Sequence, residues 1–245
     1  MPLQKGNLLV GQSGGPTPVI NASLAGVLSQ AKKMPEIARI YGMKNGIEGA
    51  LKKEVYDLSA EPDELVGKLL HTPASALGSC RHKLTKAEEY EQLLKLFQDN
   101  NIRYFVYIGG NDSMDTCAKI SQLAQERKYE MQVIGVPKTI DNDLPITDHC
   151  PGYGSAARFV ALATVESGRD LEAMKTFDDV TIFEIMGRHA GWLTAASALG
   201  KRCEEDAPHL IYLPERVFDE EKFLQDVKAV HDKLGYVYVT LCEGI

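Results

Sequence analysis

The chain has 245 residues, of which 44% are hydrophobic and 25% are charged. This composition is ordinary for a soluble globular protein, and the length allows one large domain or two modest ones. No apolar run approaches the roughly 20 residues needed to cross a bilayer, and the first residues are typical of a strand and not of a signal peptide. The sequence therefore predicts a cytoplasmic chain without a membrane partner.

The net charge of −7 argues against nucleic acid or an anionic membrane surface as a partner. It does not exclude a phosphate ligand, because phosphate sites are built locally from backbone N–H groups and a few cations. The five cysteines form no CxxC pair and no metal-like spacing. This usage favours reduced thiols in a cytosol.

Short β-branched apolar runs alternate with amphipathic stretches along the chain. The runs predict strands over residues 7–11, 103–108, 131–136, 180–186, 209–213 and 237–242. The amphipathic stretches predict helices over residues 19–33, 113–126, 154–175, 190–199 and 219–234. This alternation is typical of an α/β fold in which helices cover both faces of a parallel sheet. Residues 143–152 interrupt the pattern, so we place a boundary between two lobes, 1–146 and 147–245.

The sequence ends on a strand that runs directly into Glu243, with nothing after residue 245. In open α/β sheets, ligands bind beyond the carboxyl ends of the strands. We therefore expect elements of the fold to be missing from this chain.

Two strand ends carry paired glycines. In the first, GQSGGPTPVIN at residues 11–21, Gly14 and Gly15 let the backbone approach a ligand at the N-terminus of a helix. The loop lacks the GK[ST] and GxGxxG patterns, so a simple tight turn is the alternative. In the second, GGNDSMDT at residues 109–116, the polar residues either cap a helix or surround a metal-bound phosphate.

Two further strand ends carry charged side chains. GVPKTIDNDLP at residues 135–145 places Asp141 and Asp143 beside Lys138. A lysine can neutralise phosphate charge while a carboxylate accepts a hydroxyl proton, a combination suited to phosphoryl transfer; an Asx-turn is the local alternative. In EIMGRHAGW at residues 184–192, Arg188 follows Gly187 and is suited to hold a phosphate by its planar fork, or else is a solvated surface arginine.

Taken in order, SGG, GGNDS, PKTIDND, MGR and a final EG resemble the phosphofructokinases across essentially the whole chain. GSCR at residues 78–81 resembles the phosphate-arginine loop of that family. The resemblance implies a parallel-sheet sandwich of two Rossmann-like lobes, with the C-terminal part of the family fold absent. Residues 1–146 would bind the phosphoryl donor and residues 147–245 would bind fructose 6-phosphate. It also implies a homodimer or homotetramer.

The resemblance also implies residue roles. Asp141 would be the general base that takes the proton from the 1-hydroxyl of the sugar, with Lys138 and Asp112 completing the catalytic set. Mg²⁺ would be the cofactor, with Asn111 as its ligand. The donor would be bound by Gly14, Gly15, Arg81, Gly110 and Ser113. The sugar phosphate would be bound by Thr139, Ile140, Asp143, Met186, Gly187, Arg188 and Glu243.

Two positions bear on the identity of the donor. ATP-using members of the family typically carry GGDGS and PGTIDND, whereas this chain has Asp112 and Lys138 at the changed positions, as in the pyrophosphate-dependent branch. A carboxylate would fill the space of the nucleotide α-phosphate and repel it by several kcal/mol, and the lysine would stabilise the departing phosphate. The implied activity is reversible phosphorylation of fructose 6-phosphate by pyrophosphate. The alternatives are an ATP-dependent 6-phosphofructokinase and a non-catalytic phosphosugar-binding subunit.

Overall fold

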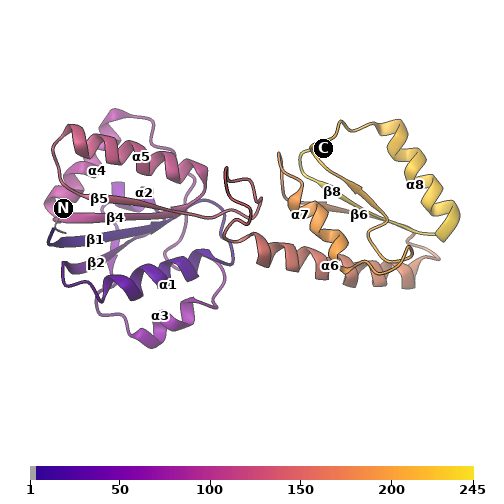
Figure 1. Cartoon of the computed structure of the whole chain (residues 1–245), viewed down its shortest axis with the longest axis horizontal. Coiled ribbons are helices and arrows are strands. Elements are labelled where there is room, and N and C mark those ends of the chain that lie inside the picture. Colours follow the sequence, from indigo (N-terminus) through magenta and orange to yellow (C-terminus); the bar gives the residue numbers. More distant parts are fainter. Residues whose placement is uncertain (1–3) are drawn as a thin grey trace. The chain divides into compact units, whose positions relative to one another are not determined.

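The computed structural model describes residues 4–245, which form two compact units that divide between Lys138 and Thr139. We call them unit 1 and unit 2. The division lies earlier in the chain than the expected boundary after residue 146, so residues 139–146 belong to unit 2. Each unit is built on its own β-sheet with helices packed against it (Figure 1), and the predicted α/β class is confirmed.

Unit 1 has a five-stranded sheet in the order β3-β2-β1-β4-β5. Neighbouring strands are parallel except for the edge strand β3, which pairs antiparallel with β2. The antiparallel edge was not predicted. The strands are β1 (Gly6–Gln12), β2 (Ile37–Met43), β3 (Val55–Asp57), β4 (Ile102–Gly109) and β5 (Gln132–Pro137), and the helices are α1 (Ile20–Ala31), α2 (Ile47–Leu51), α3 (Asp63–Leu69), α4 (Ala87–Asp99) and α5 (Asn111–Glu126).

The central strands of unit 1 are apolar at nearly every position because both faces of the sheet are covered. Successive side chains of a strand point to opposite faces. Leu8 and Val106 accordingly pack on one side, in a core that includes α1 residues, whereas Phe105 packs on the other side against α4 and α5. The two helix layers are visible above and below the strands in Figure 1.

Unit 2 has a three-stranded parallel sheet in the order β6-β8-β7. Its strands are β6 (Val180–Ile185), β7 (Leu210–Tyr212) and β8 (Val237–Cys242). Its helices are α6 (Tyr153–Met174), α7 (Trp192–Ala196) and α8 (Glu220–Leu234), and a 3₁₀ turn, η1 (Ser197–Gly200), follows α7. The single helix predicted over residues 190–199 is therefore a short α-helix that continues as a 3₁₀ turn.

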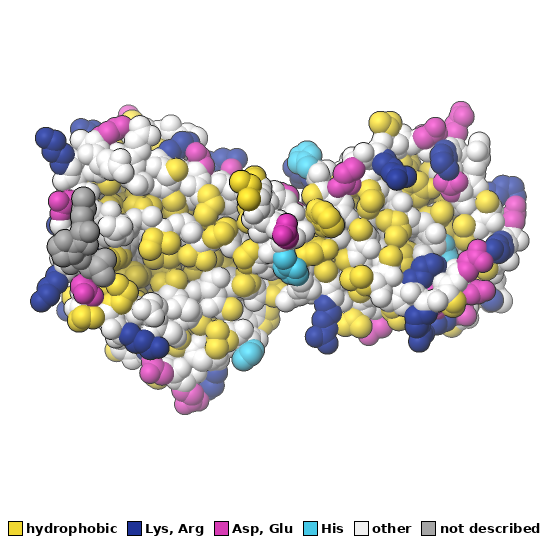
Figure 2. Space-filling model, viewed as in Figure 1, with side chains coloured by type: hydrophobic (Ala, Val, Ile, Leu, Met, Phe, Trp, Pro, Cys, Tyr) yellow, Lys and Arg dark blue, Asp and Glu magenta, His cyan; other side chains and the backbone are white. Residues whose placement is uncertain are grey.

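Apolar side chains remain exposed along two edge strands. Ile134 of β5 is 52% exposed, and Val180 and Ile182 of β6 are 44% and 54% exposed. Figure 2 shows hydrophobic side chains across the visible middle of unit 1, between its helix layers, and over much of the visible face of unit 2. Within residues 4–245, no helix is long and apolar enough to span a membrane.

Candidate active site

The predicted donor-binding residues gather at one edge of the unit 1 sheet. Because β1, β4 and β5 are parallel neighbours, the loops that follow them start at the same edge. Hydrogen bonds join these loops: Lys138 N donates to Gly109 O at 3.0 Å, and the hydroxyls of Ser13 and Ser113 share a short hydrogen bond. The structure thus brings Gly14, Gly15, Gly110, Ser113 and Lys138 into one cluster, which we call the unit 1 loops.

Lys138 lies at the centre of the unit 1 loops. Its side chain is only 5% exposed, and its ammonium donates to the carbonyl oxygen of Gly15 at 2.6 Å. A buried ammonium is costly unless hydrogen bonds compensate it, and a carbonyl is one such partner. The lysine therefore presents a fixed positive charge beside the glycine loop, as a site for a multiply charged anion requires.

Glycines are needed where these loops approach one another. Gly14 has a φ of +73°, a left-handed conformation that favours glycine, and a Cβ there would lie 3.1 Å from the Lys138 ammonium. A Cβ on Gly109 would lie 2.1 Å from the hydroxyl oxygen of Ser113. One glycine of each pair, Gly14 and Gly109, thus serves close packing between neighbouring loops, whereas a Cβ on Gly15 would meet nothing within 4 Å.

The first turn of α5 carries the other predicted polar residues. Gly110 is the N-cap and no side chain caps the helix, so the capping alternative for Asn111, Asp112 and Ser113 is wrong. Asn111 and Asp112 are exposed, and the Asp112 carboxylate forms an ion pair with Lys83 at 2.9 Å. Asp112 is therefore not the uncompensated charge that the sequence argument assumed.

Arg81 reaches this region from the segment between α3 and α4. Gly14 N donates to the carbonyl of the preceding residue, Cys80, at 2.9 Å, and the Ser79 hydroxyl donates to Gly14 O. The GSCR segment is therefore hydrogen-bonded to both the backbone N–H and the backbone carbonyl of Gly14. Arg81 follows Cys80 directly and its side chain is exposed, so it is available as a second cation in the same part of unit 1.

In unit 2, the TIDND segment forms a compact loop stabilised by its own side chains. The Thr139 hydroxyl donates to Asp143 Oδ1 at 3.2 Å and accepts from the Asp141 N–H at 3.1 Å. Asn142 has a φ of +56° and is buried, with only 8% of its surface exposed. Its side chain accepts from Cys150 N at 2.8 Å and donates to Asp148 O at 3.3 Å. Asn142 thus shapes the loop that carries both carboxylates.

The predicted sugar-phosphate residues lie at the carboxyl edge of the unit 2 sheet. β6 leads into Met186, Gly187 and Arg188, and its parallel neighbour β8 leads into Glu243. Gly187 N donates to Glu243 Oε1 at 3.4 Å, which joins the two segments. Gly187 has a φ of +132°, and a Cβ there would lie 2.4 Å from the carbonyl oxygen of Ala190. The Met186 and Arg188 side chains are exposed and can reach a ligand.

Four residues with evident roles in these loops were missed by the sequence analysis. Ser13 bonds Ser113, Lys83 pairs with Asp112, Asn142 shapes the TIDND loop, and Glu215 accepts a hydrogen bond from Gly191 N at 2.8 Å. Ser13 and Asn142 stood inside the SGG and TIDND motifs that the sequence singled out, but neither was given a role there. Lys83 and Glu215 lay outside the motifs. Ser13, Lys83 and Glu215 all contact residues far along the chain, and local spacing gives no signal of such contacts.

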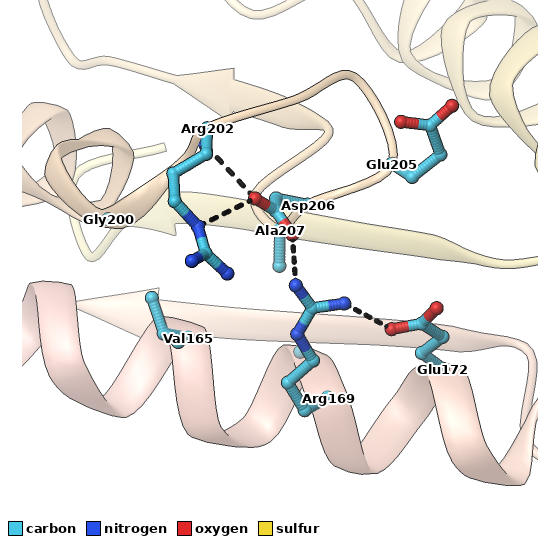
Figure 3. Close-up of a pocket in the computed structure, with 9 residues that line it drawn as sticks. Val165, Arg169, Glu172, Gly200, Arg202, Glu205, Asp206 and Ala207 are labelled. Carbon is cyan, nitrogen blue, oxygen red and sulfur yellow. Dashed lines mark hydrogen bonds and ion pairs between the residues drawn. The ribbon is translucent and has the colours of Figure 1, made fainter.

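A separate charge cluster in unit 2 surrounds Asp206 (Figure 3). Its carboxylate accepts from Arg202 N at 3.0 Å and pairs with the side chains of Arg169 and Arg202. These contacts, chiefly the Arg202 backbone N–H, lower the pKa of Asp206. Because the carboxylate already compensates the arginines, and the enclosed space is about 10 Å³, the cluster is suited to anchoring the loop before β7 and not to binding an anion.

Comparison with known proteins decides the family. Residues 7–245 match the Phosphofructokinase family. The chain belongs to the phosphofructokinase family. This assignment confirms the resemblance that the sequence motifs carried.

Relatives with similar sequences carry more specific descriptions. The pyrophosphate–fructose 6-phosphate 1-phosphotransferase of Xanthomonas campestris is 47% identical over 99% of this chain and 59% of its own length. The enzyme of the same name from Halomonas elongata is 46% identical over 97% of this chain and 58% of its own. The crystal structure of pyrophosphate-dependent phosphofructokinase from Marinobacter aquaeolei has a TM-score of 0.90 and 48% identity, covering 98% of this chain and 60% of that one. The chain thus spans about three-fifths of the length of these relatives and resembles the pyrophosphate-dependent branch.

Proposed function

We propose that this chain carries the donor-binding and catalytic residues of a pyrophosphate-dependent phosphofructokinase. The observation that carries the proposal is Lys138, a buried ammonium bonded to the glycine loop at Gly15. Family members that use ATP typically have glycine at this position. A fixed charge here suits a donor whose leaving group is phosphate, because inorganic phosphate departs with more concentrated negative charge than a nucleotide.

In the proposed reaction, unit 1 binds pyrophosphate and unit 2 binds fructose 6-phosphate. Asp141 accepts the proton of the sugar 1-hydroxyl, and that oxygen attacks the terminal phosphorus of pyrophosphate. The bond between that phosphorus and the bridging oxygen breaks, giving fructose 1,6-bisphosphate and phosphate. Lys138 stabilises the charge on the departing phosphate, and Arg188 holds the 6-phosphate of the sugar. Pyrophosphate and fructose 1,6-bisphosphate, the phosphoryl donors of the forward and reverse reactions, have comparable transfer potential, so the reaction is reversible.

Mg²⁺ belongs to the same proposal. Among residues 4–245, no group of three or more His, Cys, Asp or Glu side chains is placed to hold a metal ion. This fits Mg²⁺, which usually binds through one or two protein oxygens together with substrate phosphates and water. The exposed amide oxygen of Asn111, at the start of α5, is the ligand we propose. The ion would neutralise phosphate charge during transfer.

Further parts of the proposal are a cytoplasmic location, the absence of nucleic-acid and membrane partners, and a homodimer or homotetramer. All follow from composition and the family resemblance. Sedimentation of the complete protein would determine the oligomeric state.

The test is the initial rate of the complete protein with fructose 6-phosphate and Mg²⁺, comparing pyrophosphate with ATP as donor. We expect phosphorylation with pyrophosphate. Activity with ATP alone would retain the family but exclude the donor assignment. No turnover with either donor, with retained binding of fructose 6-phosphate, would favour the non-catalytic phosphosugar-binding subunit.

A further inference from the structure

The segment 187–191, which carries Arg188, is held by two carboxylates at its two ends. Glu243, which follows β8, accepts from Gly187 N at 3.4 Å. Glu215, in the segment after β7, accepts from Gly191 N at 2.8 Å. Because β6, β8 and β7 are parallel, all three segments start at the same edge of the sheet. Glu243 is a predicted substrate ligand, whereas Glu215 has no role in the proposed function.

Close packing leaves the backbone of this segment little room to move. A Cβ on the buried Gly191 would lie 2.7 Å from Glu215 Oε2, 2.9 Å from Leu213 Cδ2 and 3.1 Å from Pro214 Cδ. On the other side, a Cβ on Gly244 would lie 2.1 Å from the carbonyl oxygen of Arg188. Shifting either end would therefore move the Arg188 backbone, from which the exposed guanidinium projects.

The turn after β7 explains how Glu215 reaches this position. Arg216 N donates to Leu213 O at 3.2 Å, which closes a turn around Pro214 and Glu215. Proline fixes φ near the value that such turns need at this position. The turn directs the Glu215 carboxylate at the Gly191 N–H, which has no intrahelical acceptor because Gly191 is the N-cap of α7.

We propose that Glu215 is a positioning residue for sugar-phosphate recognition: its carboxylate fixes the segment 187–191 so that Arg188 meets the 6-phosphate of fructose 6-phosphate. The inference rests on the proposed function, since it assigns the ligand of Arg188 from it. The carboxylate acts through the backbone and does not contact the phosphate, which it would repel. Loss of the carboxylate would thus weaken binding of the sugar phosphate without weakening binding of pyrophosphate.

The test compares Glu215→Ala and Glu215→Gln with wild type in the complete protein. The glutamine keeps an oxygen that can accept from Gly191 N, whereas the alanine does not. A hydrogen bond to a charged group is worth enough to change affinity by about 10- to 100-fold. We expect Glu215→Ala to raise KM for fructose 6-phosphate by about that factor, with KM for pyrophosphate unchanged and Glu215→Gln within about threefold of wild type. Glu166→Ala, which removes an exposed carboxylate from α6, is the matched control.

Several results would overturn the inference. One is a KM for fructose 6-phosphate within about twofold of wild type in Glu215→Ala. Another is an equal rise in both KM values together with a lower Tm, which would indicate a merely structural cap of α7. If wild type has no turnover, the proposed function fails, and calorimetric Kd values for fructose 6-phosphate replace KM in the same comparison. Wild type that binds no fructose 6-phosphate would defeat both.

Discussion

Replacing Lys138 with methionine tests the centre of the proposed donor site. The substitution removes the ammonium and its hydrogen bond to Gly15 O, and it keeps an unbranched side chain that fills much of the same space. The side chain is 5% exposed, so its charge is screened far less than that of a surface lysine. For charges about 4 Å apart, an effective dielectric constant of about 20 gives an interaction of about 4 kcal/mol.

This estimate corresponds to a change of about 10³-fold in rate, since each 1.36 kcal/mol is about tenfold. We therefore expect Lys138→Met to lower kcat/KM for pyrophosphate by about 10²–10³-fold, the lower figure allowing for solvent that enters in place of the ammonium. Removing a buried charge also removes its desolvation cost, which offsets the loss of the contacts that the ammonium makes, including its hydrogen bond to Gly15 O. The Tm should stay within a few degrees of wild type, measured by thermal denaturation.

Lys83→Met is the matched control from the same part of unit 1. The Lys83 side chain is 65% exposed, so the same charge acts through water. At the dielectric constant of water, we expect Lys83→Met to remove about 1 kcal/mol of interaction and to lower kcat/KM for pyrophosphate roughly fivefold. The argument that burial makes Lys138 the dominant charge would be refuted by either of two results. One is an equal decrease of kcat/KM for pyrophosphate in the two variants, and the other is a decrease below about tenfold in Lys138→Met.

Three further predictions follow from the structure. Asp112→Gly should raise kcat/KM for ATP by only about fivefold, because the carboxylate is exposed and paired with Lys83; an unchanged value would show that Asp112 does not exclude ATP. Asp141→Asn should lower kcat by about 10²–10⁴-fold while calorimetry shows unchanged binding of fructose 6-phosphate, and an unaltered kcat would exclude Asp141 as the base. Burial lowers the pKa of His209 from 6.5, and His209 Nδ1 accepts from Tyr238 N at 2.8 Å, so protonation favours the unfolded chain. The free energy of unfolding should therefore fall as pH drops below about 6.5, more steeply in wild type than in His209→Gln; equal slopes in urea denaturation would contradict this.

The sequence predicted the elements whose patterns are repeated and uninterrupted. β8 was predicted with its exact bounds, and β1, β4 and β5 within a residue or two, because their side chains are apolar on both faces. β2 was missed because Arg39 and Gly42 interrupt its apolar run, and β3 because it has only three residues, all exposed. α4 was not predicted, although the spacing of its apolar residues in the sequence is typical of an amphipathic helix.

The loops of the site were found in sequence, but the contacts that shape them were not. Glycine pairs and charged residues after strands are visible locally, and parallel topology then brings the loops to one edge of each sheet. The Lys83–Asp112 ion pair joins α5 to the segment before α4, and the Glu215–Gly191 hydrogen bond joins segments after different strands. Such pairs depend on side-chain direction in the folded chain. The ion pair also lowers the expected exclusion of ATP by Asp112, because a compensated, exposed carboxylate repels a nucleotide much less than an isolated one.

Two backbone segments near the proposed ligands are held by side chains of opposite charge, the Gly15 loop by a lysine and the segment 187–191 by two glutamates. In unit 1 the glycine loop offers its carbonyl, at Gly15, to the Lys138 ammonium, which is thereby held beside the loop where we propose that pyrophosphate binds. In unit 2 the backbone offers N–H groups at Gly187 and Gly191, which carboxylates accept. A lysine or arginine could not perform that second task, because it has no acceptor. Carboxylates bonded to the backbone hold the segment while Arg188 remains exposed. The negative residues are therefore consistent with the phosphate site that we propose at Arg188, because their charge is directed at backbone N–H groups.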